Sequence, residues 1–310
     1  MKTVMVSGGA GFIGSHLCES LINLKYKVFC VDNLLTGSPK NLKKIVNNRN
    51  FTFIEHDIVS PLNIKCDLIF NLACPASPIH YQNDPVKTIR TNVNGSINML
   101  ELAKKNKAKI LQASTSEIYG DPLVHPQIEN YNGNVNPIGP RSCYDEGKRC
   151  AETLFFDYKR QFGLDIKILR IFNTYGPRLN LDDGRVVSNF IVQALSNKKI
   201  TIYGDGTQTR SFCYIDDMVN AFISLMNSNK NTTGPYNAGN PNEINMNDLA
   251  KKIIKITKSN SQITYKKLPQ DDPIKRKPNI EKIIKKLKWK PKTSLENGLK
   301  KTISYFKGKL

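Results

Sequence analysis

Short apolar runs alternate with longer segments of helical periodicity through the first 171 residues of the chain. The apolar runs are rich in Val, Ile, Leu and Phe, which favours strands buried within a sheet. The pattern predicts strands at 3–7, 27–31, 51–55, 68–71, 109–114 and 165–171, and helices that include 13–24, 88–105 and 144–162. Strands that alternate with helices predict right-handed βαβ units and a parallel sheet covered on both faces.

The pattern changes after this point, because Ile-Phe-Asn-Thr-Tyr-Gly-Pro at 171–177 interrupts the alternation. We predict helices near 187–196 and at 216–226, with a short strand at 201–204 between them. Residues 236–239 are expected to form a late strand that rejoins the sheet. From residue 247 onward we expect small helices linked by turns that contain Pro.

The composition is that of an ordinary globular protein, with 39% hydrophobic and 23% charged residues. No apolar run approaches the roughly 18 residues that a membrane helix requires. No signal peptide fits before the strand at 3–7, so we expect a cytoplasmic protein with no membrane partner. The seven cysteines are scattered without a C-x-x-C pair, so neither a metal site nor a disulfide framework is expected.

The net charge of +20 is concentrated in residues 251–310, which hold 18 Lys and one Arg against four acidic residues. Such a surface can bind nucleic acid, or the lysines can form the solvated face of amphipathic helices. The second interpretation is favoured because the lysines lie between apolar residues, as in Lys-Lys-Ile-Ile-Lys-Ile at 251–256. We therefore expect no nucleic-acid partner.

A glycine-rich loop follows the first predicted strand directly and opens the first helix. Its sequence is Gly-Gly-Ala-Gly-Phe-Ile-Gly at 8–14, and the candidate cofactor-binding residues in it are Gly8, Gly11, Phe12, Ile13 and Gly14. Glycines allow a tight turn and a close backbone approach to a pyrophosphate, and a helix N-terminus favours phosphate. This context is typical of a dinucleotide-binding Rossmann fold.

Two acidic residues at the ends of later strands complete the candidate cofactor site. Asp32, followed by Asn33, ends the second strand and is expected to bind the ribose hydroxyls, which favours NAD over NADP. Asp57, followed by Ile58, ends the third strand and is a candidate for the adenine edge. A loop aspartate or helix cap remains the alternative for Asp57.

These patterns predict an α/β fold, a doubly wound parallel Rossmann sheet with a smaller, discontinuous α/β substrate domain. We assign 1–173 plus 212–240 to the NAD-binding domain. The substrate domain is assigned to 174–211 plus 241–310.

Tyr144 and Lys148 are four residues apart and lie on one face of the helix predicted at 144–162. A nearby cation favours the phenolate, so we expect Lys148 to lower the pKa of Tyr144 and make it a base. The strand at 109–114 runs into Ser-Thr-Ser-Glu at its carboxyl end, where open α/β sheets bind ligands. Thr115 is expected to hydrogen-bond a reacting hydroxyl, and Glu117 adds a carboxylate.

Four longer motifs accompany these residues. They are Asn-Leu-Ala-Cys-Pro-Ala-Ser-Pro-Ile-His-Tyr at 71–81, Ser-Thr-Ser-Glu-Ile-Tyr-Gly-Asp-Pro at 114–122, Asn-Pro-Ile-Gly-Pro-Arg-Ser-Cys-Tyr-Asp-Glu-Gly-Lys-Arg at 136–149, and Tyr-Gly-Asp-Gly-Thr-Gln-Thr-Arg-Ser-Phe at 203–212. Over essentially its whole length the chain resembles the extended short-chain dehydrogenase/reductase family. Within it, the four motifs resemble the UDP-glucuronate decarboxylases.

The resemblance implies oxidation of UDP-glucuronate at C4 by bound NAD, with Tyr144 as base. The resulting β-keto acid would lose CO₂, and reduction at C4 would then give UDP-xylose. The resemblance also implies a homodimer that packs the helices at 88–105 and 144–162 into a four-helix bundle, and a structural role for Asn92. Its implied substrate-binding residues are Pro75, Ser77, Tyr81, Asn173, Arg178, Arg185, Tyr203, Arg210 and Arg276.

Other activities in the same family remain alternatives. A decarboxylase that releases the UDP-4-keto-pentose would share nearly all of these residues. The related 4,6-dehydratases place an Asp-Glu pair after the threonine, whereas this chain has Ser116 before Glu117, and 4-epimerases have small residues where Glu117 lies. A binding protein that has lost catalysis would not need the Tyr144–Lys148 pair.

Overall fold

The structure is a computed structural model that describes residues 1–268 and 275–310. Its centre is a seven-stranded sheet in the order β11-β6-β5-β4-β1-β2-β3, in which every neighbouring pair is parallel. The strands are β1 Thr3–Ser7, β2 Lys27–Asp32, β3 Phe51–Glu55, β4 Leu68–Asn71, β5 Lys109–Thr115, β6 Ile166–Ile171 and β11 Tyr236–Ala238. The predicted strands are confirmed, including the late strand that rejoins the sheet.

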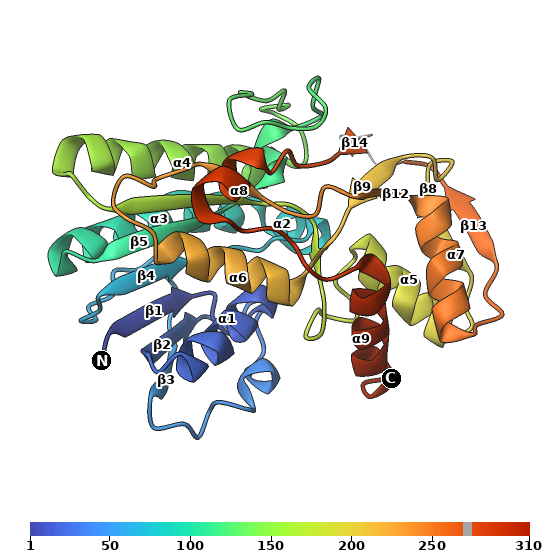
Figure 1. Cartoon of the computed structure of the whole chain (residues 1–310), viewed down its shortest axis with the longest axis horizontal. Coiled ribbons are helices and arrows are strands. Elements are labelled where there is room, and N and C mark those ends of the chain that lie inside the picture. The colour runs from blue at the N-terminus through green and yellow to red at the C-terminus, as the bar shows by residue number, and fades with distance from the viewer. Residues whose placement is uncertain (269–274) are drawn as a thin grey trace.

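Two layers of helices cover the sheet (Figure 1). On one face lie α1 (Phe12–Asn23) and α6 (Ile215–Met226), and on the other lie α3 (Pro85–Asn106) and α4 (Ser142–Phe162). Successive strand side chains point to opposite faces, so Val4 and Val6 of β1 join the core under α1 and α6, and Met5 joins the core under α3 and α4. The predicted doubly wound arrangement is therefore confirmed.

Local capping explains why α3 begins earlier than the hydrophobic pattern predicted. Asp84 accepts a hydrogen bond from the Lys87 backbone N–H at 2.9 Å, and Pro85 occupies the first turn. Both features stabilise a helix N-terminus. At the C-terminal end of a different helix, α4, Gly163 takes a left-handed conformation with φ 66° and ends the helix.

A second group of elements lies beside the carboxyl ends of the strands (Figure 1). The group includes α5 (Val186–Leu195), β8 (Ile200–Tyr203), α7 (Met246–Thr257), β13 (Ile263–Lys266) and α9 (Leu295–Lys307). None of the helices in the described ranges is long and apolar enough to cross a bilayer. The division into two domains with the boundaries given above stays a prediction, and 269–274 lie outside the described residues.

The sequence prediction for the tail was incomplete. Its helices are confirmed as α7, α8 (Glu281–Leu287) and α9, but two strands were missed. β13 pairs in parallel with β8, and β14 (Lys275–Arg276) pairs in parallel with β9 (Thr209–Ser211). These short strands are stabilised by partners about sixty residues away in the chain, a signal that a local pattern does not carry. The β9–β14 pairing places Arg276 opposite Arg210.

Candidate active site

A cavity of about 1020 Å³ lies at the carboxyl edge of the sheet and extends to the second group of elements. The edge includes the point between β1 and β4 where the strand order reverses, which is where open α/β sheets bind ligands. Every residue predicted to take part in catalysis, cofactor binding or substrate binding lines this cavity. The fold therefore brings together all of the predicted positions, from Gly8 to Arg276.

The β1–α1 loop forms one wall of the cavity and fits a pyrophosphate. Gly8 has φ +70°, and a Cβ on Gly14 would lie 2.1 Å from the Gly8 carbonyl oxygen. Gly11 caps α1 without a side-chain hydrogen bond, and the first turn holds no acidic residue. The backbone N–H groups at this helix N-terminus thus remain for an anion, which is the arrangement that NAD requires.

Gly14→Ala is expected to lower NAD affinity by more than about tenfold, because the added methyl group forces the loop away from Gly8. Gly163→Ala provides a matched control, since its Cβ would meet nothing within 4 Å. It should lower thermal stability slightly and leave NAD affinity unchanged. Calorimetric titration with NAD measures the affinity of each variant. Equal affinities for the two variants would contradict this assignment of the loop.

Asp32 ends β2 at the adjoining wall. Its carboxylate accepts hydrogen bonds from the backbone N–H groups of Ala10 at 2.9 Å and Leu34 at 2.8 Å. Burial raises the pKa of Asp32, and the backbone N–H groups oppose that shift. The carboxylate is thus held by the backbone of the glycine-rich loop and of Leu34, and its contact with a ribose stays a prediction.

Asp57 lies beyond β3 and has partners of its own. It forms an ion pair with Lys87, and it accepts hydrogen bonds from Asn33 Nδ2 at 3.1 Å and from the Val59 N–H at 3.0 Å. Burial raises the pKa of Asp57, but the hydrogen bond from Lys87 and these other contacts bring it below its usual range. Asp57 therefore caps the turn after β3, and its contact with adenine stays a prediction.

Tyr144 and Lys148 lie in the first two turns of α4 and are 6% and 3% exposed. The Lys148 ammonium donates to the Ala113 carbonyl of β5 at 2.9 Å and lies 5.7 Å from the centroid of the Tyr144 ring. The ring of Tyr81 stacks on that of Tyr144 with 5.1 Å between centroids. These contacts leave the phenol little freedom to turn.

The expected effect of Lys148 on Tyr144 is wrong for this structure. Burial raises the pKa of Tyr144 well above its ordinary value, and Cys74 and Glu117 raise it further. The hydrogen bond with Thr115 opposes this shift, whereas Lys148 has its own pKa lowered by burial. Desolvation of the phenolate outweighs the nearby cation here.

Glu117 lies between two arginines. Arg141 Nη2 approaches Glu117 Oε2 at 2.5 Å, and Arg276 contacts both carboxylate oxygens, at 2.5 and 3.1 Å. Burial alone would raise the pKa of Glu117, but the two guanidinium groups lower it to about 2. The carboxylate is therefore ionised across the physiological range.

Arg141 is the functional candidate that sequence reasoning missed. It precedes Tyr144 by three residues and lies inside a motif quoted above, which was the available signal. Arg276 was expected among the substrate-binding residues, and in the structure it contacts Glu117. We call Glu117, Arg141 and Arg276 the arginine clamp.

Several of the other candidate residues have partners of their own. Arg185 pairs with Asp183, Arg178 pairs with Glu19 of α1, and Ser77 donates to the Asp183 carbonyl. Tyr203 is 44% exposed. Asn92 does not line the cavity but lies against Gly147, where a Cβ would approach its side chain to 2.8 Å. It lies between α3 and α4, and its structural role stays a prediction.

Comparison with known proteins gives a consistent picture. Residues 4–239 match the NAD dependent epimerase/dehydratase family. "UDP-glucuronic acid decarboxylase 3" of Arabidopsis thaliana is 57% identical over 297 residues, 96% of this chain and 86% of that protein. "UDP-glucuronic acid decarboxylase 1" of Xenopus tropicalis is 50% identical over 309 residues, 100% of this chain and 73% of that protein.

Among solved structures, UDP-glucuronic acid 4-epimerase from Bacillus cereus, in complex with UDP-glucuronic acid and NAD, superposes with a TM-score of 0.90. The two sequences are 30% identical, and the match covers 99% of this chain and 100% of that one. The parallel sheet, the glycine-rich loop and the similarity over the length of the chain all indicate the same family. The chain belongs to the NAD dependent epimerase/dehydratase family and, within it, to the group of the UDP-glucuronic acid decarboxylases.

Proposed function

We propose that the protein converts UDP-glucuronate to UDP-xylose and CO₂, with NAD bound throughout the cycle. The observation that carries this proposal is the arginine clamp beside Tyr144 in the cavity. Guanidinium groups bind carboxylates through charged, bidentate hydrogen bonds, so Arg141 and Arg276 suit the carboxylate of a uronic acid. The names of the most similar relatives support the same substrate and reaction.

We assign the first proton transfer to Tyr144, which takes the proton of the C4 hydroxyl while Thr115 hydrogen-bonds the same group. NAD held by the glycine-rich loop and Asp32 would supply the hydride acceptor for C4 and the hydride donor for the later reduction. The positive charges of Lys148 and of the oxidised nicotinamide favour the phenolate, against the burial that raises its pKa.

The arginine clamp is assigned to the decarboxylation step. Arg141 and Arg276 hold the sugar carboxylate through planar, bidentate hydrogen-bonding groups. Once C4 is a ketone, this carboxylate leaves as CO₂, because the electrons left at C5 delocalise into the adjacent carbonyl. The ionised Glu117 keeps both arginines at the cavity wall throughout.

The remaining candidates are assigned to the rest of the substrate. Arg178, Arg185, Arg210 and Asn173 supply hydrogen bonds and charge for the diphosphate, and Tyr203 lines the uridine pocket. Pro75, Ser77 and Tyr81 shape the sugar pocket. Because Arg178 and Arg185 already pair with Glu19 and Asp183, the substrate has to compete with those carboxylates.

We also infer a cytoplasmic homodimer that packs α3 and α4 against the same helices of a second copy. Exposed apolar residues on these helices, Val86 and Ile89 of α3 and Phe162 of α4, support this surface. Sedimentation velocity of the wild type and of an Ile89→Glu variant tests the dimer.

The decisive experiment is incubation of the purified protein with NAD and UDP-glucuronate, followed by mass spectrometry and NMR of the nucleotide sugar. The expected product is UDP-xylose without net NADH. A UDP-4-keto-pentose with stoichiometric NADH would instead identify a decarboxylase that omits the reduction. An unchanged mass with inverted C4 would identify a 4-epimerase, as in the Bacillus cereus neighbour, and would overturn the proposal.

A further inference from the structure

A buried ion pair between Glu152 of α4 and Arg170 of β6 lies behind the Tyr144–Lys148 pair. We propose that this pair positions Lys148 and the end of β5, and that its charge balance sets the pH range in which Lys148 stays cationic. The inference rests on the proposed function, because it gives Glu152 and Arg170 a part in the same chemistry. Neither residue lines the cavity, so both are positioning residues.

Almost all hydrogen-bonding groups of the pair have partners. The Arg170 guanidinium donates to both Glu152 carboxylate oxygens, from Nε at 2.9 Å and from Nη2 at 2.8 Å. Both side chains are about nine-tenths buried. A buried ion pair adds little stability over well-packed apolar residues of the same volume. Its presence at this point therefore suggests a purpose beyond holding α4 to the sheet.

Glu152 connects the pair to the catalytic residues along two routes. Through α4, it is four residues beyond Lys148 and eight beyond Tyr144, on the same helix face. Through β5, Glu152 Oε1 accepts a hydrogen bond from Ser114 Oγ at 2.5 Å. Ser114 stands between Ala113, whose carbonyl accepts from Lys148, and Thr115. The carboxylate thus fixes both the helix and the strand that hold the reacting groups.

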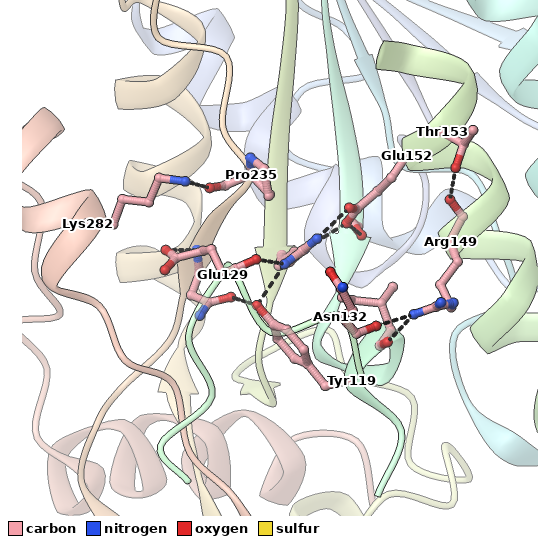
Figure 2. A network of polar contacts seen from close by, with 12 residues as sticks. Tyr119, Glu129, Asn132, Arg149, Glu152, Thr153, Pro235 and Lys282 are labelled. Carbon is pink, nitrogen blue, oxygen red and sulfur yellow. Dashed lines mark hydrogen bonds and ion pairs between the residues drawn. The ribbon is translucent and has the colours of Figure 1, made fainter. Parts of the chain in front are cut away.

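On its far side the pair is anchored to a polar network that spans the sheet edge. Arg170 Nη1 donates to Tyr119 Oη and to the Glu129 carbonyl, both at 2.9 Å. Figure 2 shows Glu152 on one side of this junction and Tyr119 and Glu129 on the other. Tyr119 Oη donates in turn to Asn237 of β11 at 2.8 Å. The orientation of Arg170 is therefore determined by three separate elements.

Among the residues that the structure describes, few titratable groups face Lys148. From α4 they are Tyr144 and Glu152, and from the loop after β4 it is Cys74, while β5 contributes the Ala113 carbonyl. On the α3 side the uncharged Asn92 lies against Gly147, the residue before Lys148, and on β6 Arg170 pairs with Glu152. Burial lowers the pKa of Lys148, whereas Cys74 and Glu152 raise it. A change in charge at Glu152 is therefore expected to shift the pKa of Lys148.

The test uses two single variants whose expected effects have opposite signs. Glu152→Gln keeps the shape and the acceptor for Ser114 but removes the negative charge, so the alkaline limb of kcat/KM should move down by about one pH unit. Arg170→Gln leaves the Glu152 carboxylate without its counter-ion, so the same limb should move up by a similar amount. The double variant should return close to the wild-type profile. KM for UDP-glucuronate and affinity for NAD should change by less than about threefold in each.

Thermal unfolding and NAD binding show whether each variant is folded, and Glu101→Gln on the exposed surface of α3 is the matched control with no shift. A purely structural pair would lower stability and rate in both single variants without moving the limb in opposite directions, and that result would overturn the proposal. An NMR titration of Lys148 in the NAD-bound protein measures the same shifts without turnover. The opposite shifts can thus be present even if the proposed function is wrong. Equally, they can be absent even if the proposed function is right.

Discussion

Tyr144→Phe should lower kcat for UDP-glucuronate decarboxylation by about 10²–10⁴-fold, the contribution typical of a positioned general base. The substitution removes a single oxygen from a ring that is buried and stacked against Tyr81, so the cavity keeps its shape. Binding of UDP and of NAD should therefore survive, and the loss should fall on kcat. Single-turnover measurement of NADH formation at saturating substrate isolates this step.

The matched control is Tyr158→Phe, which removes a phenol from the same helix. Tyr158 Oη donates to Glu101 at 2.7 Å at the surface, far from the cavity lining. This variant should retain wild-type turnover within about twofold. Normal activity of Tyr144→Phe would show that another group takes the C4 proton, and the proposed mechanism would then be wrong.

Glu117→Gln is expected to lower kcat by about 10²-fold or more, with a change in KM below tenfold. The amide cannot neutralise Arg141 and Arg276, so two buried guanidinium groups lose their shared counter-ion and the clamp loses its geometry. Steady-state kinetics with UDP-glucuronate separates the two parameters. Losses confined to KM would show that Glu117 is only part of the pocket wall.

The pH dependence of the wild type provides a second check on Glu117. Its pKa is lowered from 4.5 to about 2, so the stabilising ion pairs are fully present above the ordinary value and are lost only as pH falls toward 2. An acid limb of kcat near neutrality must therefore belong to another group and should persist in Glu117→Gln. Glu146→Gln, which removes a half-buried carboxylate on α4 that pairs with Arg149 at 3.3 Å, should leave kcat unchanged.

Much of the fold was predictable because its signals are local. The alternation of apolar runs with helical periodicity predicted the strands of the parallel sheet, since each buried strand and each helix face leaves its own period in the sequence. The glycine-rich loop was equally clear, because the turn at Gly8 and the contact between Gly8 and Gly14 each require the absence of a side chain. The short strands β13 and β14 show no such period in the sequence, so they were not predicted.

The candidate residues were predictable as a set, but their partners were not. Motifs placed Glu117, Arg276 and Tyr144 at one site, and all three line the cavity. Nothing in the sequence indicated that Glu117 would lie between Arg141 and Arg276, because Arg276 is 159 residues away along the chain. Arg141 was therefore missed although it lies three residues from Tyr144.

The chain's own pattern determined the sheet, its helices, the dinucleotide loop and the spacing of Tyr144 and Lys148, all of which depend on residues close together in sequence. Only the tertiary structure decided the charge environment of those residues. Burial raised the pKa of Tyr144 against the nearby cation, and the folding of β6 beside α4 put Arg170 against Glu152. Desolvation and long-range ion pairing depend on which distant segments meet, and a local period contains no information about them.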